Sequence, residues 1–259
     1  MVPDAGPLAA ALIGGAAIAF LLSVFGGGGS VLATPLLLYV VGVRDPHVAI
    51  GTSAAAVAVN ALGGLLAQAK AGRVKWPCAL TFGGAGLSGA LLGAHLAKQM
   101  DGGKLLLWFA VAMAVVAISM LLPKKGEGDP AVHLTPAMTL KLAPVGLGTG
   151  LAAGFFGIGG GFLIAPGLMA ATGMTLANAA ASSLVSVVLF GAATSASYAL
   201  SGLIDWPVFI ALVAGGAFGT LAGVPASKAL ASRAPVARRL FAAMVLITAA
   251  YVAWRSLAG

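Results

Sequence analysis

The chain has 259 residues, of which 60 % are hydrophobic and only 8 % are charged, and its mean hydropathy is +1.06. Ordinary soluble domains carry about 25 % charged residues, so a soluble fold of this length could not cover its surface with so few. Apolar runs of roughly 20 residues, the length that spans a bilayer as a helix, recur along the chain. The composition therefore predicts one integral membrane domain with no soluble appendage.

The net charge of +8 does not by itself indicate a nucleic-acid partner. Membrane proteins gather basic residues in their cytoplasmic loops, which accounts for the excess. The single cysteine, Cys78, excludes a disulfide framework and a cysteine-based metal cluster. The opening MVPDAGPLAA has no basic stretch before the apolar run, so we expect a retained helix there rather than a cleaved signal peptide.

Five apolar segments are expected in each half of the chain. All of them should be helices, because an open sheet would leave backbone groups unpaired in lipid. Their approximate bounds are 8–24, 31–42, 47–69, 77–97 and 104–122 in the first half, and 138–155, 162–173, 176–200, 207–230 and 237–256 in the second. This organisation predicts a first transmembrane repeat over 1–123, a cytoplasmic linker over 124–137 and a second repeat over 138–259.

The two halves match when they are shifted by about 130 residues. FGGGGSVLATP, at 25–35, returns as FGIGGGFLIAP, at 156–166, and GRVKWP, at 72–77, returns as GLIDWP, at 202–207. The small-residue stretches AIGTSA and AASSLV also correspond, at 49–54 and 180–185. Self-similarity at a fixed interval indicates two related structural units.

The second segment of each half is too short to cross the membrane alone. About a dozen residues at 1.5 Å each fall well short of the ~30 Å hydrocarbon core. We therefore expect a half-helix or a broken hairpin there, with the half-helices beginning at about Ser30 and Gly161. The glycine runs before them should break the helices at membrane depth, which is tolerated only where the break is buried or lines a wet cavity.

The charged loops predict that the second repeat is inverted relative to the first. The turn at 70–75 is basic while its counterpart in the second half holds only Asp205. In the loop between the fourth and fifth segments, in contrast, the second half is the more basic one. With the Lys70 loop in the cytoplasm, both termini face the periplasm. Ten of the fourteen basic residues then lie inside, namely Lys70, Arg73, Lys75, Lys124, Lys125, Lys141, Lys228, Arg233, Arg238 and Arg239.

The two glycine breaks are the predicted substrate site, and the substrate is expected to be an anion. Inverted repeats with broken helices bind their substrates where the breaks meet, and helix N-termini favour negative groups. None of the six acidic residues lies inside an apolar segment, whereas cation carriers and proton relays usually keep one there. The candidate substrate-binding residues are Gly26, Gly27, Gly28, Gly29, Ser30, Thr52, Ser53, Asn60, Gly157, Gly159, Gly160, Gly161, Ser182 and Ser183.

Other patterns indicate architecture. Small residues recur at every fourth position in the fourth segment of each half, which is typical of close helix packing; they are Ala85, Gly89, Gly93, Gly215, Gly219 and Gly223. Lys70 is interpreted as a basic residue that helps to fix the orientation of the protein in the membrane and that could also attract anions. No catalytic triad, P-loop or metal-ligand spacing is present, so we expect neither an enzyme nor a bound cofactor or metal.

These motifs make the chain resemble the TauE/SafE family of sulfite-exporter-like membrane proteins over nearly its whole length. The likeness rests on GGGGSVLATP and GIGGGFLIAP, on GTS at 51–53 with ASS at 181–183, and on GRVKW at the turn between the third and fourth segments. It implies a secondary transporter for sulfur-containing anions, such as sulfite or sulfonates, in the bacterial inner membrane. Ile158 and Gly161 depart from the first copy of the glycine motif, so a symmetric site is not expected.

Two other transport modes stay open, an anion channel and a proton-coupled uptake permease for an organic anion. Export is favoured because the membrane potential drives anions out of the cell without a coupling ion. The expected partners are a small anionic substrate and membrane lipid, with a homodimer possible and no nucleic acid.

Overall fold

The computed structural model describes residues 5–121, 128–157, 161–231 and 234–258, and these form an all-helical protein. Within those ranges the one departure from helices and loops is an isolated bridge between Asp129 and Met174. The regular helices are α1 Ala5–Phe25, α3 Pro46–Lys70, α4 Trp76–Ala97, α5 Gly102–Leu121, α6 Pro136–Phe156, α7 Gly161–Thr172, α8 Leu176–Ala199, α9 Trp206–Ala231 and α10 Ala234–Ala258. Between α1 and α3 lie the 3₁₀ helix η1 Gly26–Leu32, the short α2 Ala33–Leu36 and the π-helix η2 Leu37–Val41.

Several helices begin at a capping side chain followed by proline or by an uncharged first turn. Asp45 accepts a hydrogen bond from the backbone N–H of His47 at the start of α3, and Thr135 does the same for Met138 at the start of α6. Thr175 caps α8 in the same way. These side chains satisfy N–H groups that have no partner inside the helix, which explains why the helices start there.

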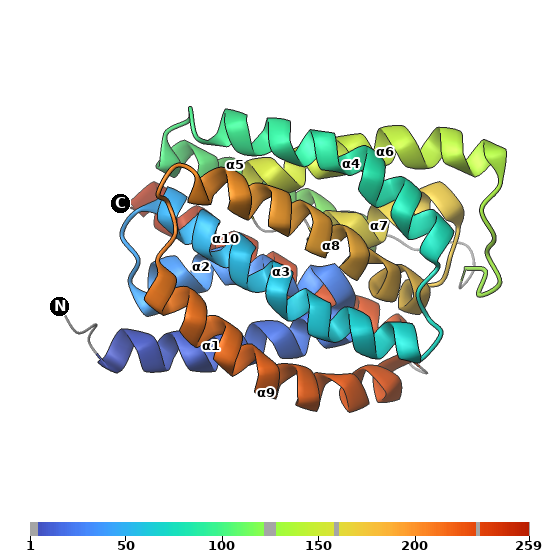
Figure 1. Cartoon of the computed structure of the whole chain (residues 1–259), viewed down its shortest axis with the longest axis horizontal. Coiled ribbons are helices and arrows are strands. Elements are labelled where there is room, and N and C mark those ends of the chain that lie inside the picture. Colours follow the sequence, from blue (N-terminus) through green and yellow to red (C-terminus); the bar gives the residue numbers. More distant parts are fainter. Residues whose placement is uncertain (1–4, 122–127, 158–160, 232–233, 259) are drawn as a thin grey trace.

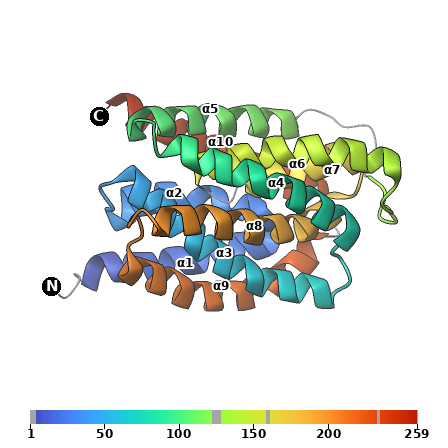
Figure 2. The same ribbon diagram turned by 45° about the horizontal axis from the view of Figure 1, so that its top comes forward.

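The helices run side by side along the long axis of the molecule (Figure 1). In this view α3 and α8 lie side by side in the middle, between the pair α4–α6 on one side and the pair α1–α9 on the other. The turned view shows α5 and α10 together at one edge (Figure 2). Each of the regular helices therefore has at least one partner from the other half of the chain.

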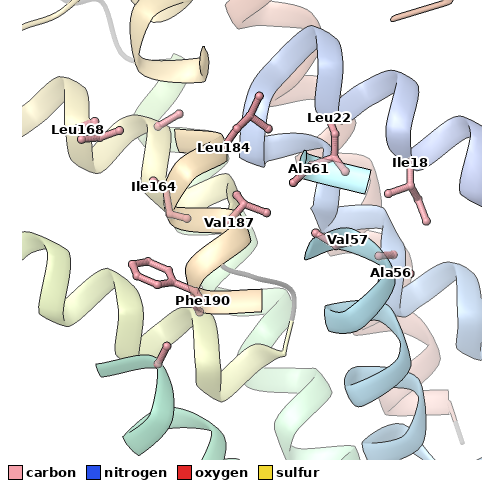
Figure 3. Close-up of a cluster of buried hydrophobic side chains, with 14 of the residues drawn as sticks. Ile18, Leu22, Ala56, Val57, Ala61, Ile164, Leu168, Leu184, Val187 and Phe190 are labelled. Atoms are coloured by element: carbon pink, nitrogen blue, oxygen red, sulfur yellow. The ribbon is translucent and has the colours of Figure 1, made fainter. Parts of the chain in front are cut away.

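The main core lies where α1, α3, α7 and α8 meet (Figure 3). Leu184, Val187 and Phe190 of α8 are fully buried there, together with Val57 of α3 and Ile164 of α7. In contrast, many large apolar side chains on the outer helix faces are exposed, as lipid contact requires. Examples are Ile13, Leu140, Ile210, Phe218 and Ile247.

Seven stretches of the described residues are long and apolar enough to cross a membrane. They are Gly6–Val41, Pro46–Lys70, Trp76–Ala97, Gly102–Leu121, Pro136–Phe156, Leu176–Ala199 and Trp206–Ser227, and the 12-residue helix Gly161–Thr172 is apolar but shorter. The protein is thus a multi-pass membrane protein built from helices.

Small residues let the backbones of α4 and α6, and of α1 and α9, come into direct contact. A side chain on Gly89 or Gly93 would overlap the backbone of α6, and one on Gly215 or Gly219 would overlap carbonyl oxygens of α1. The close-packing role predicted for these glycines is confirmed. It requires the absence of a Cβ, because the facing atoms are backbone atoms that cannot rotate away.

The expected helix bounds agree with the structure to within a few residues, with one exception. The half-helix of the first half was expected to begin at about Ser30, after a break at the glycine run. That expectation is wrong, because Gly26–Gly29 form the first turn of the 3₁₀ helix η1. The glycines therefore leave fewer backbone groups free than an unwound loop would.

Candidate functional site

The first helix of each half ends at a glycine with a left-handed backbone. Gly26 has φ +63° directly after α1, and Gly157 has φ +65° as the C-terminal cap of α6. Glycine adopts this conformation without the steric cost of a Cβ. A side chain would also overlap the neighbouring chain at each place, the backbone of Ala180 at Gly26 and the side chain of Ile50 at Gly157.

The second segment of each half packs against the first helix of the same half. Gly14 of α1 faces Leu36 of α2, and Gly29 of η1 lies against the backbone of α1 at Leu22. In the second half, a Cβ on Gly167 of α7 would lie 3.3 Å from Val145 of α6.

The two breaks touch each other through their backbones. A Cβ on Gly27 would lie 2.6 Å from the Cα of Gly161, and one on Gly161 would overlap the carbonyl oxygen of Gly27. The N-terminal end of α7 thus abuts η1, although these segments are far apart in the sequence. No side chain separates them, so a ligand at this point needs the breaks to move apart.

Ser183 of α8 connects the third helix of the second half to the first break. Its Oγ accepts a hydrogen bond from the N–H of Gly27 at 3.0 Å and donates to the carbonyl oxygen of Ala180 at 2.7 Å. Ser30 donates to the carbonyl oxygen of Gly27 at 2.7 Å. Both serines are fully buried. At the first break, a hydroxyl group therefore pairs with the N–H of Gly27 and another with its carbonyl oxygen.

Ser53 of α3 is the corresponding contact to the second break. Its Oγ lies 3.5 Å from the carbonyl oxygen of Gly157, 3.0 Å from that of Ile50 and 2.9 Å from the Oγ1 of Thr34. Thr34 was not among the predicted site residues. Thr34 could have been predicted from the sequence, because it lies four residues after Ser30 and residues four apart share a helix face.

Thr52 and Ser182 are adjacent in sequence to these serines but point elsewhere. Thr52 Oγ1 accepts a hydrogen bond from the N–H of Asp205 at 2.9 Å, and Ser182 Oγ accepts one from the N–H of Lys75 at 2.9 Å. Asp205 and Lys75 immediately precede α9 and α4. The two hydroxyls therefore anchor the starts of the fourth helices, away from the breaks.

Asn60 also turns away from the breaks. Its Nδ2 donates to the carbonyl oxygen of Leu212 on α9 at 3.3 Å, and its amide occupies the space that a side chain on Gly216 would need. Asn60 of α3 corresponds in the repeat to Phe190 of α8. The ring of Phe190 occupies the space beside Gly86 of α4, as the amide of Asn60 does beside Gly216 of α9. Asn60 thus has a packing partner in α9.

Gly28 and Gly29 are constrained by packing as well as by their place in the break. A Cβ on Gly28 would overlap the ring of Phe241 on α10, and one on Gly29 would overlap the backbone of α1. A bulky substitution at Gly28 would therefore disturb the fold whether or not the substrate passes there. Gly159 and Gly160 lie outside the residues that the structure describes.

The surroundings of the breaks are polar but uncharged. The sequence has no Asp, Glu, Lys or Arg at 25–41, 46–69 or 151–199, and the one histidine in these ranges, His47, lies in the first turn of α3. Backbone N–H groups and serine and threonine hydroxyls can donate hydrogen bonds to an anion, and they do so most strongly where water is excluded. A site of this kind can donate hydrogen bonds to an oxyanion, and no carboxylate lies in these segments.

The fold and this site define a polytopic helical membrane protein with two broken segments at its centre. Residues 11–252 match the model of the family described as "Sulfite exporter TauE/SafE". The chain therefore belongs to the TauE/SafE family, which the glycine motifs of the sequence already resembled. It is a membrane transporter rather than an enzyme.

Named relatives agree with this assignment. The chain is 44 % identical over 243 residues to a "Probable membrane transporter protein" of Xylella fastidiosa, covering 93 % of each chain. It is 27 % identical over 232 residues to the "Probable membrane transporter protein YunE" of Bacillus subtilis, covering 82 % of this chain and 85 % of that one. No solved structure shows significant similarity to the chain.

Proposed function

We propose that the protein carries small sulfur-containing anions, such as sulfite or sulfonates, across the bacterial inner membrane and that it works mainly in export. The observation that carries this proposal is the meeting of the two breaks at Gly27 and Gly161, with buried hydroxyls around them and no charged residue in these segments. The family's description as sulfite exporters supports the substrate class. Neutral hydrogen-bond donors suit an anion, whereas a cation carrier usually has a negatively charged side chain at its site.

The substrate would take the place of Ser183 at the first break. In this structure the Ser183 hydroxyl accepts the hydrogen bond of the Gly27 N–H, which is the role that a sulfonate or sulfite oxygen would have. Because the breaks are in direct backbone contact, we infer that this is a closed state. Opening would separate η1 from α7 and release both the Gly27 amide and the hydroxyls of Ser30 and Ser53 for the anion.

We further propose that the two halves form an inverted repeat. Helices α3 and α8, α5 and α10, and η1 and α7 each pack against their own counterparts, while α1–α9 and α6–α4 are equivalent contacts. Such an exchange of partners is expected when two related units are joined by a pseudo-two-fold axis. The left-handed glycines support the same correspondence; they are Gly26 with Gly157, Gly42 with Gly173, and Gly72 with Gly202.

The proposed orientation places the turn between α3 and α4 in the cytoplasm and both termini in the periplasm. Figures 1 and 2 show the start of α1 and the end of α10 at one end of the bundle and that turn at the opposite end. Arg73 and Lys75 lie in the turn, and Asp205 lies in the corresponding turn at the other end. This distribution follows the rule that basic residues stay in the cytoplasm.

The membrane potential would drive export. With the cytoplasm negative, a monovalent anion that leaves the cell gains about 2.3 kcal/mol per 100 mV, and a divalent anion about twice as much. Uptake would have to move the anion against this field. The uncharged site offers no carboxylate for proton coupling, which favours electrogenic transport.

The test is transport by the purified protein in liposomes loaded with labelled sulfite or a sulfonate. An inside-negative potassium potential, set with valinomycin, should accelerate efflux without a pH or sodium gradient, and the flux should saturate with substrate concentration. If a pH gradient alone drives transport and the potential has no effect, the protein is a proton-coupled permease. Unitary currents in a planar bilayer would instead identify an anion channel.

A further inference from the structure

A groove between α3 and α9 opens at the end of the molecule that holds the turn between α3 and α4. Its walls are mostly apolar, and one end carries an ammonium group. The lining residues are Gly63, Leu66 and Lys70 of α3 and Leu221, Val224 and Pro225 of α9. This groove lies apart from the two breaks, and none of the proposed transport steps uses it.

The groove faces the lipid. Leu66 is 63 % exposed and Leu221 is 75 % exposed, both on the outer faces of helices that are long enough to cross the membrane. Gly63 lies seven residues before Lys70, which places the inner end of the groove about 10 Å from the charge along the helix. That length lies within one leaflet of a hydrocarbon core of ~30 Å.

Lys70 is an unpaired cation at the end of a helix that is long enough to cross the membrane. It is exposed in the last turn of α3, and it makes no hydrogen bond or ion pair within the described part of the chain. No acidic residue occurs in the sequence between Asp45 and Asp101 or after Asp205. Trp76, 44 % exposed at the start of α4 just after the same turn, marks the membrane interface.

We propose that the groove binds an anionic phospholipid, with one acyl chain against Leu66 and Leu221 and the phosphate on the ammonium of Lys70. Apolar walls that end in a free cation match the two parts of such a lipid, as basic pockets between transmembrane helices do elsewhere. Thr220 lies within the groove and offers a hydroxyl donor below the phosphate. A zwitterionic lipid fits the walls equally well but gains less from the charge.

Native mass spectrometry of the full chain in detergent tests this proposal, with dioleoyl phosphatidylglycerol and dioleoyl phosphatidylcholine as probes. The wild type should bind phosphatidylglycerol about five-fold more tightly, which is the equivalent of about 1 kcal/mol for one basic residue at the membrane surface. Lys70→Gln should bind phosphatidylglycerol no more tightly than phosphatidylcholine. Lys141→Gln is the matched control, because Lys141 is also exposed but lies on α6, and it should keep the preference.

A second variant tests the groove itself. Ala67→Phe places a ring between the two helices and should reduce the binding of both lipids, while the thermal stability of the protein stays near that of the wild type. Equal binding of the two lipids by the wild type, or an unchanged preference in Lys70→Gln, would overturn the proposal. Loss of a protein dimer in Ala67→Phe without any lipid preference would also overturn it and assign the groove to a second copy of the chain.

Discussion

At the residue scale, neighbouring hydroxyls on one helix have different partners. Thr52 and Ser53 are consecutive in α3, and Ser182 and Ser183 are consecutive in α8, so each pair is separated by about 100° around its helix axis. Ser53 and Ser183 therefore reach the breaks, whereas Thr52 and Ser182 reach the backbone before α9 and α4. The four residues are all fully buried, and only their direction separates the two roles.

Ser183→Ala should lower transport by about ten-fold or more while the protein still folds. The change removes the hydroxyl that accepts from the Gly27 amide in the closed state, and leaving that buried N–H without a partner disfavours this state, through which each transport cycle must pass, by about 1–3 kcal/mol. Ser183→Thr keeps a hydroxyl and should restore part of the flux. Efflux from proteoliposomes gives the readout, with Ser195→Ala on the exposed face of the same helix as control.

A wild-type flux in Ser183→Ala, at equal protein in the vesicles, would remove this hydroxyl from the substrate path. A lower flux accompanied by aggregation during purification would indicate a purely structural role. The comparison with Ser195→Ala separates these results, because Ser195 only bonds the carbonyl oxygen of Ala192 in its own helix.

Thr52→Ala and Ser182→Ala should each lower the stability of the protein by about 1 kcal/mol and leave the substrate dependence of transport unchanged. Each change removes one side-chain acceptor for the N–H that precedes a fourth helix, and the usual net value of such a bond is of that size. Thermal unfolding of the purified variants measures the stability, and the substrate concentration at half-maximal flux measures the site. A large change in that concentration would place the hydroxyls in the site after all.

At the scale of elements, two helix pairs depend on backbone contact. Gly150 and Gly154 of α6 lie against the carbonyl oxygens of Gly86 and Ala90 on α4, and Gly219 of α9 lies against Ala16 of α1. In a membrane there is little hydrophobic force between helices, so close approach and dispersion contacts hold such pairs together. The glycine-rich faces thus supply the rigid outer pairs between which α3, α8 and the breaks are held.

Gly150→Ala should lower stability by about 1–3 kcal/mol, because the added methyl group overlaps the backbone of α4 and the helices must separate. Gly148→Ala on the same helix is the matched control. A side chain at Gly148 meets no atom within 4 Å, so alanine there should be neutral or stabilise the helix by up to about 1 kcal/mol.

Thermal unfolding in a single detergent compares the two glycine variants directly. Equal midpoints for the two proteins would mean that the contact between α4 and α6 is not tight in the membrane. A lower midpoint for Gly148→Ala than for Gly150→Ala would reverse the assignment of the packing face of α6.

At the scale of the whole molecule, the arrangement places two broken segments in the middle and the charged turns at the ends. The turns at 71–75 and 200–205 correspond to each other in the two halves and lie at opposite ends of the bundle (Figure 1). Their charges differ in sign, which is the feature on which the proposed orientation rests.

Single cysteines at these turns test the orientation. In a Cys78→Ala background, Leu200→Cys should react with an impermeant thiol reagent added to intact cells, whereas Ala71→Cys should react only after the membrane is opened. Both positions are exposed and Cys78 is buried, so differences in labelling report the side of the membrane. Labelling of both cysteines from outside would contradict the inverted repeat.

The helices and their approximate ends could be predicted from the sequence, because length and apolar composition within each segment are local properties. The beginning of α7 at Gly161 was also predicted, since the glycine run and Pro166 mark the segment. The 3₁₀ form of Gly26–Gly29 was not, because a glycine run is compatible with an unwound loop as well as with a tight helix. These glycines pack closely against Leu22, Phe241 and Gly161, and the local sequence contains no information about those contacts.

The sequence by itself determined that this protein is a helical membrane transporter of the TauE/SafE family, with duplicated glycine motifs and acidic residues kept out of its apolar segments. Hydropathy is sufficient for the helical membrane class, because the bilayer allows few other structures, whereas the family and the transport function were indicated by the resemblance of the motifs. Only the tertiary structure decided which hydroxyls reach the breaks and which anchor α4 and α9, and that Asn60 packs on α9. Those roles depend on contacts between residues more than 100 positions apart, whose geometry no local pattern contains.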